Sequence, residues 1–264
     1  MTSFNNEDLY LMLLDRLRKD RKGSVSPEEF ESFLRWRNLD YFNKMVSVEG
    51  ENKMNENALM PFFIPNIPLD IAQDSQTLLY YADITDLTTY AQYINVWHTL
   101  DVVNPTRPDM TDIVPIDMVS QAELPDRLRN AITLPTAEDP IGYIVNGTAG
   151  HRLYVHGISS TTGTILLSYY RLPPDPYFDY YVDSSGNITY LTDESPATTH
   201  VLLAGEESRD GKVAGQTVTS ASTDLAWGDD DAINILDMIV SDVSIALSDP
   251  NSFQASLLER KENA

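Results

Sequence analysis

The distribution of prolines restricts where this chain can form long helices. The sequence has 264 residues and 15 prolines, and nine of the prolines fall between residues 61 and 140. Each proline fixes its own φ, removes a backbone donor and biases the preceding residue away from the α region. Residues 77–84 and 93–103 lie between these prolines and are rich in aromatic and β-branched side chains, so they predict strands. Long helices are therefore expected only on either side of this stretch.

The first 47 residues have the periodicity of two amphipathic helices. Residues 6–22 and 27–47 repeat apolar side chains at helical spacing and predict an antiparallel helical hairpin. Gly23 suits the end of the first helix. Ser26 and Glu29 form a capping-box pattern at the start of the second.

The same junction can be aligned with a calcium-binding loop that starts at Arg18. That alignment puts Gly23 and Glu29 at suitable positions, but Arg18 and Lys22 then stand where calcium needs oxygen ligands. The capped helix junction is therefore preferred to a metal site.

The second half of the chain predicts strands followed by helix. Residues 141–192 contain apolar runs separated by turn-forming residues, including a hairpin signal across 183–187. Three aspartates at 229–231 favour a helix start, and an apolar stripe follows to Leu247. Asp249–Pro250 predicts the end of that helix and the start of a short last one.

This order predicts an α+β fold. We expect a helical bundle formed by the N- and C-terminal helices, with an inserted antiparallel β domain. The expected boundaries are residues 1–60 for an N-terminal helical hairpin and 61–222 for a proline-rich and β insertion region. Residues 223–264 would then form C-terminal helices that pack with the N-terminal hairpin.

The charge of the chain restricts its partners. The formal net charge is −22, and residues 1–60 hold 9 basic and 11 acidic residues while the remainder holds 9 basic and 29 acidic. Such a field repels phosphate backbones and anionic membrane surfaces. A negative field is suited to the wall of a channel through which DNA passes without binding, although a role in solubility alone would explain the charge equally. The absence of cysteine excludes disulfides, and neither a signal peptide nor a membrane span is predicted.

Residue types that are common in metal-binding and phosphate-binding sites are present, but they do not have the spacing that such sites need. The four histidines, at positions 98, 151, 156 and 200, match no metal-binding spacing. The segment Gly205–Val213 approaches a phosphate loop, but five residues separate its glycines and Val213 replaces the magnesium-binding hydroxyl. We interpret it as a turn.

Two acidic segments and the tyrosines also have simpler interpretations than ligand binding. Asp183 to Glu194 could line a calcium loop, but Ile188 replaces the required glycine, so a hairpin is preferred. Asp229–Asp231 could bind a divalent cation weakly, and we prefer the helix-start role. The 14 tyrosines could stack on single-stranded nucleic acid, yet their acidic setting favours sheet packing and protein interfaces. No catalytic, cofactor-binding or metal-binding residue is predicted, and the chain is not expected to be an enzyme.

Several short segments together are similar to a known group of proteins. They are Gly23–Phe30, Leu134–Pro135, Asp139–Val145, Arg152–His156, Ile165–Pro176, Ser220–Trp227 and Leu247–Pro250. In these segments the chain resembles virion structural proteins of tailed phages, especially crAss-like phages that infect Bacteroidales. Members of this group form the neck, or head-to-tail connector, as rings stacked on a twelve-fold portal.

The resemblance implies a structural, non-enzymatic function. The expected protein is a connector ring subunit that docks on the portal and extends the DNA exit channel. Its expected partners are the portal, other neck and tail ring proteins, and further copies of itself in a dodecameric ring. DNA would pass through the lumen without specific binding, no membrane would be involved, and the protein would lie in the virion neck after assembly in the host cytoplasm. Residues 248–264 are expected to form an arm on the portal.

Two other functions stay open at this point. The first is a phage fibre, decoration protein or other tail structural protein that binds a surface ligand through the β region. The second is a hydrolase with an acidic site at Asp229, Asp230 and Asp231.

Overall fold

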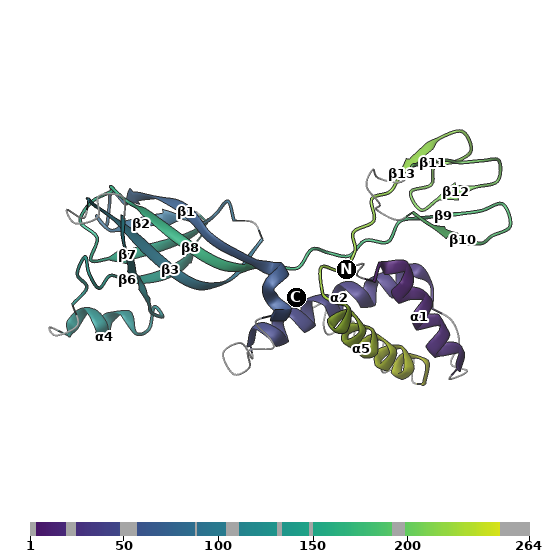
Figure 1. The fold of residues 1–264 in the computed structure, drawn as a ribbon, viewed down its shortest axis with the longest axis horizontal. Coiled ribbons are helices and arrows are strands. Elements are labelled where there is room, and N and C mark those ends of the chain that lie inside the picture. Colours follow the sequence, from purple (N-terminus) through teal and green to yellow (C-terminus); the bar gives the residue numbers. More distant parts are fainter. Residues whose placement is uncertain are drawn as a thin grey trace. The chain divides into compact units, whose positions relative to one another are not determined.

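The structure is a computed structural model in which two compact units are distinguished (Figure 1). It describes residues 4–19, 25–47, 57–87, 89–103, 111–130, 134–147, 150–191 and 199–248. Unit 1 combines Met1–Pro61 with Pro173–Ala264, and unit 2 is Phe62–Leu172. The short last helix expected after Asp249–Pro250 lies outside the described residues.

Unit 2 is built on one eight-stranded sheet with the strand order β4-β3-β8-β1-β2-β7-β6-β5. The strands are β1 (Phe63–Gln73), β2 (Tyr80–Asp83), β3 (Tyr90–Val103), β4 (Thr111–Pro115), β5 (Asp117–Met118), β6 (Ile141–Gly147), β7 (Gly150–His156) and β8 (Thr164–Arg171). All neighbouring pairs are antiparallel except β5 with β6, which is parallel. A short helix, α4 (Leu124–Arg129), lies in the connection between β5 and β6.

One extended segment brings the two edges of this sheet together. The edge strands β4 and β5 are consecutive in the chain and are separated only by Ile116. The first pairs with β3 and the second with β6, while the Ile116 backbone N–H donates to the Val96 carbonyl at 2.9 Å. The sheet is therefore nearly closed and barrel-like.

The core of unit 2 follows the alternation expected of strands with one buried face. Val96 on β3, Leu153 and Val155 on β7, and Ile165 and Leu167 on β8 are all at most 2% exposed. Each such side chain contributes about 1.5–3 kcal/mol by leaving water. The burial of these apolar side chains in the interior thus stabilises the barrel-like sheet.

Unit 1 contains helices and two small sheets. The helices are α1 (Asn6–Lys19), α2 (Pro27–Ser47) and α5 (Asp229–Ser248), and α5 packs against both of the others. The sheets have the orders β10-β9-β12 and β11-β13. Their strands are β9 (Tyr180–Val182), β10 (Ile188–Tyr190), β11 (Thr199–Val201), β12 (Glu207–Ser208) and β13 (Thr217–Thr219). A 3₁₀ turn, η1 (Met60–Phe62), lies at the division between the units.

Polar side chains fix the helices of unit 1 to one another. The Arg37 guanidinium donates to both carboxylate oxygens of Asp242 at 2.6 and 2.5 Å, which joins α2 to α5. The Tyr41 hydroxyl donates to Asp231 at 2.7 Å and strengthens the same contact. Burial and the Asp231 carboxylate raise the pKa of Tyr41 to about 12.

The capping box at the start of α2 is confirmed. The Ser26 backbone N–H donates to the Glu29 carboxylate at 2.9 Å, and the Glu29 N–H donates to the Ser26 hydroxyl at 3.2 Å. Gly23, expected at the end of the preceding helix, lies outside the described residues.

The predicted fold class, a helical bundle with an inserted β domain, is wrong. Strand predominates in the described part of the chain, and its largest element is the barrel-like sheet. The prolines obscured part of the sheet at the level of sequence, because β1 contains Pro65 and Pro68 and is still paired with β8. A register shift at this point places Asn66 at φ 48°, and its N–H donates to the Ser168 hydroxyl at 3.1 Å. A bulge therefore accommodates the missing donors.

Candidate functional site

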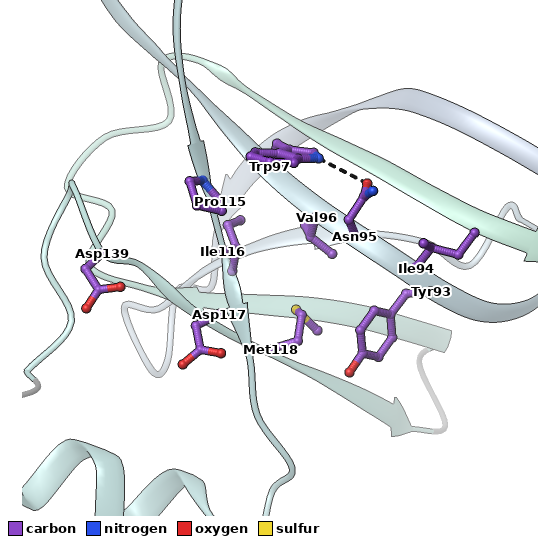
Figure 2. A pocket seen from close by; sticks show the side chains of 10 residues that line it. All are labelled: Tyr93, Ile94, Asn95, Val96, Trp97, Pro115, Ile116, Asp117, Met118 and Asp139. Atoms are coloured by element: carbon purple, nitrogen blue, oxygen red, sulfur yellow. Dashed lines mark hydrogen bonds between the residues drawn. The ribbon is translucent and has the colours of Figure 1, made fainter. Parts of the chain in front are cut away.

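A cleft opens in unit 2 at the point where the sheet closes. Its volume is about 440 Å³, within the range of small-ligand sites. It is lined by Tyr93, Ile94, Asn95, Val96, Trp97, Pro115, Ile116, Asp117, Met118 and Asp139 (Figure 2). We call it the seam cleft.

The cleft exists because one segment changes its partner strand. Pairing between β3 and β4 runs as far as Trp97 and Pro115. After Ile116 the segment pairs with β6 instead, where Asp117 is opposite Ile141. The register of β3 against β8 also shifts between Tyr93 and Asn95. The residues of β3 that precede Val96 are thus separated from β5, and the gap between these two strands is the cleft.

Aromatic side chains form one wall of the seam cleft. Trp97 and Asn95 alternate with the buried Val96 and so face away from the core. The Trp97 indole N–H donates to the Asn95 side-chain oxygen at 3.0 Å, which fixes the plane of the indole (Figure 2). Tyr93 is 36% exposed. The cleft is therefore lined by one oriented aromatic ring and by a second, more accessible ring.

The floor of the cleft depends on a glycine. A Cβ at Gly142 would lie 2.8 Å from both the Ile116 Cγ2 atom and the Met118 sulfur. Such distances are shorter than van der Waals contact, so a side chain at this position would require Ile116 and Met118 to shift. Gly142 therefore maintains both the closure of the sheet and the shape of the cleft.

The rim of the cleft is acidic. Asp117 forms an ion pair with Arg127 of α4, and their side chains are 47% and 37% exposed. Asp139 ends a turn in which its backbone N–H donates to the Thr136 carbonyl and hydroxyl, both at 3.2 Å. In the view of Figure 2 the two carboxylates lie toward one end of the cleft and Tyr93 toward the other. Because they are exposed, water screens each of these charges.

The seam cleft presents groups that can bind a ligand. It offers aromatic faces, an amide and carboxylate oxygens, and Arg127, which lies at its rim, is paired with Asp117. A ligand that fits must supply hydrogen-bond donors and a flat or apolar surface. Across the described residues, no group of three His, Asp or Glu side chains is placed to hold a metal ion.

The four histidines are placed in different surroundings. His98 is 4% exposed inside unit 2, where burial lowers its pKa and the nearby Thr162 backbone opposes this only in part. His151 Nδ1 lies 2.8 Å from the Asn146 side-chain oxygen. In unit 1, His200 stacks on Tyr181 with ring centroids 4.2 Å apart, and its Nε2 lies 2.7 Å from a Glu206 carboxylate oxygen.

The fourth histidine belongs to a row of rings on unit 2. We call Tyr81, Tyr154, Tyr143 and His156 the aromatic row. Tyr143 stacks on both Tyr154 and His156, with centroids 5.6 and 5.7 Å apart, and Tyr81 lies 5.7 Å from Tyr154. The Arg152 guanidinium lies 4.5 Å above the Tyr81 ring. These tyrosines pack on one another along the sheet, as expected of tyrosines used in sheet packing.

The loops that resembled ligand-binding motifs form turns that are closed by hydrogen bonds within the loops themselves. One Asp183 carboxylate oxygen accepts the Ser185 and Asn187 N–H groups at 2.8 Å each, and the predicted hairpin is confirmed as β9 and β10. Backbone hydrogen bonds lower the pKa of Asp183. The segment Gly205–Val213 forms turns around β12, as predicted, with Gly205 and Gly211 at positive φ.

The acidic run at the start of α5 is used in contacts within unit 1. Asp229 begins the helix, as predicted, and accepts the Phe4 N–H at 3.2 Å. Asp231 accepts the Tyr41 hydroxyl. The run is therefore divided between two different partners.

Sequence reasoning missed the seam cleft altogether. Its residues come from β3, from the closing segment and from the turn before β6, and no local motif connects them. The one available signal was the alternation of Asn95 and Trp97 around an apolar residue, which marks an outward aromatic on a strand.

Comparisons with known proteins add no relative. No protein-family model matches the sequence, and no curated protein matches it either. In the portion of the chain that is described, no helix has both the length and the hydropathy needed to cross a bilayer.

Proposed function

We propose that this protein is a structural virion protein, a head-to-tail connector ring subunit that docks on the portal and extends the DNA exit channel. The observation that carries the proposal is an exposed apolar surface on a strongly acidic chain. In unit 1, Val201, Leu203 and Val213 are 55%, 64% and 55% exposed. An acidic protein that nevertheless exposes neighbouring aliphatic side chains is suited to being covered by another protein.

The local geometry groups these side chains. Val201 and Leu203 are alternate residues of one extended stretch, so they point to the same side. The Leu202 N–H donates to the Gln216 carbonyl at 3.0 Å, and the Val213 N–H donates to the Gln216 side chain at 3.0 Å. Gln216 thus connects the strand to the turn that carries Val213. We call these three residues the aliphatic edge.

A ring subunit needs two unlike contact faces, because head-to-tail association joins different surfaces of adjacent copies. The aliphatic edge is suited to one such face, and the seam cleft, with its aromatic wall and acidic rim, differs from it in chemistry. The net charge of −22 supports the channel role, since an acidic lumen repels the DNA that passes through it. The portal as partner follows from the sequence resemblance.

The test is the native mass of the full chain, alone and after addition of the cognate portal. A monomer that becomes a closed ring on the portal is the expected result. Replacement of Leu203 by Asp should prevent ring formation, whereas replacement of the exposed Leu78 of unit 2 by Asp serves as a control. A stable trimer that ignores the portal would overturn the proposal.

A second candidate, a fibre or decoration protein that binds a surface ligand, is favoured by the aromatic row. Aromatic side chains with a few polar groups line many ligand sites, and Arg152 lies over the Tyr81 ring of this row. It predicts binding of saccharides to the full chain and loss of that binding when Tyr143 is replaced by Ala. Absence of saccharide binding, together with portal-dependent rings, would decide for the connector.

A further inference from the structure

The seam cleft combines an oriented aromatic wall with uncommitted carboxylate oxygens. We propose that it binds the guanidinium group of an arginine presented by a protein segment of an adjoining virion component. This deepens the proposed ring function and rests on it for the identity of the partner. The chemistry of the occupant follows from the cleft itself.

The aromatic wall favours a flat cation. Trp97 is fixed by its hydrogen bond to Asn95, and Tyr93 is a second, accessible ring in the lining. A guanidinium is planar and weakly hydrated, so it stacks on such rings with less loss of hydration than an ammonium. The apolar stem of an arginine can lie along Met118 and Ile116 at the same time.

The acidic rim supplies the matching charge. Within the described ranges, the Asp139 carboxylate has no hydrogen-bond or ion-pair partner, and the turn at Thr136 holds its backbone. A carboxylate with two available oxygens is suited to the two parallel donors of a guanidinium. Residues 62–172 hold 12 acidic and 5 basic residues, so the field of unit 2 attracts a cation and repels phosphate.

The cleft already shows how an arginine is accommodated at its rim. Arg127 of α4 forms its ion pair with one oxygen of Asp117, next to the cleft. The incoming arginine would be held in the same manner at Asp139, with Trp97 as the additional stacking surface.

The first experiment uses the full chain and N-acetyl-arginine amide, with N-acetyl-citrulline amide as the matched neutral probe. The indole N–H resonance of Trp97, assigned by comparison with a Trp97→Phe variant, reports binding by NMR. We expect a saturable shift at millimolar concentrations of the arginine probe and none with citrulline. Equal shifts with both probes, or none with either, would overturn the inference.

Variants then locate the site. Asp139→Asn should weaken binding of the arginine probe by about two- to fivefold, because one charged partner is lost at an exposed site. Asp70→Asn is the control, since Asp70 is an exposed aspartate on β1 of the same unit that does not line the cleft. Equal weakening by both substitutions would show a general charge effect and would overturn the inference.

The same variants separate this inference from the proposed function. If the wild-type chain binds the probe but forms no ring on the portal, the connector proposal fails and the arginine site stands. If rings form while the probe does not bind, the arginine site fails and the connector proposal stands. Loss of rings in Asp139→Asn but not in Asp70→Asn would support both.

Discussion

The ion pair between Glu31 and Arg209 should be a main contributor to the stability of unit 1. Glu31 lies on α2 and is 4% exposed, and it accepts hydrogen bonds from the Arg209 guanidinium and from the Phe178 N–H at 3.1 Å. Arg209 also donates to the Phe178 carbonyl at 2.7 Å and lies 4.5 Å above the Tyr177 ring. The pair therefore attaches the β region of unit 1 to its helices.

Replacement of Arg209 by Met would keep much of the side-chain volume and leave the buried Glu31 carboxylate without its principal cation. Breaking such a buried pair costs about 3–5 kcal/mol. Arg35 also reaches Glu31 at 3.0 Å and remains in place, so we expect the lower end, about 3 kcal/mol. For a unit of this size that corresponds to a decrease of about 6–12 °C in Tm.

Urea and thermal unfolding followed by circular dichroism would measure this loss. Arg16→Met is the matched control, because the Arg16–Asp237 pair lies in the same unit with side chains 37% and 58% exposed, and it should cost less than about 1 kcal/mol. The double variant Glu31→Gln, Arg209→Met should recover part of the loss, with a coupling of about 1–3 kcal/mol. Equal losses for Arg209→Met and Arg16→Met, or simple additivity in the double variant, would refute the reasoning.

Three further predictions follow from single residues. Burial lowers the pKa of His98 in the folded chain. As the pH decreases, His98 is therefore protonated in the unfolded chain before it is protonated in the folded chain, and the free energy of unfolding should fall below about pH 6.5. Urea midpoints between pH 5 and 8 should depend less on pH in His98→Leu, and an unchanged slope would contradict this. Gly142→Ala should cost about 1–3 kcal/mol, because its Cβ would meet Ile116 and Met118, and it should also move the Trp97 indole resonance. A variant as stable as the wild type would show that the closing segment is free to shift. Ser26→Ala should cost about 1 kcal/mol through loss of the cap, measured by urea unfolding, and a loss near zero would mean that α2 does not depend on this cap.

Local features of the sequence were predictable because their causes lie within a few residues. Ser26 and Glu29 satisfy each other across one helical turn, and the hairpin at Asp183 is closed by its own loop. The start of α5 at Asp229 follows from the favourable interaction between acidic groups and the helix dipole. None of these depends on a distant part of the chain.

The fold class was not predictable in the same way, because proline has a different effect in different surroundings. Pro65 and Pro68 interrupt the local strand signal, yet Ser168, which is 102 residues away from Asn66, supports the bulge that accommodates them. Whether a proline ends a strand or only bends it is therefore decided by the neighbouring strand. A single sequence does not reveal that neighbour.

The seam cleft extends the same argument from fold to function. Its two walls belong to β3 and to the segment that closes the sheet, and they separate where that segment leaves one strand for another. The position of the exchange depends on Ile116 reaching Val96 and on Gly142 having no side chain. A site that forms where a segment changes its partner strand has no local sequence motif, because its residues are brought together only when the sheet closes. In a small barrel-like sheet with a filled interior, the place where pairing changes is thus where a binding site can form without removing core side chains.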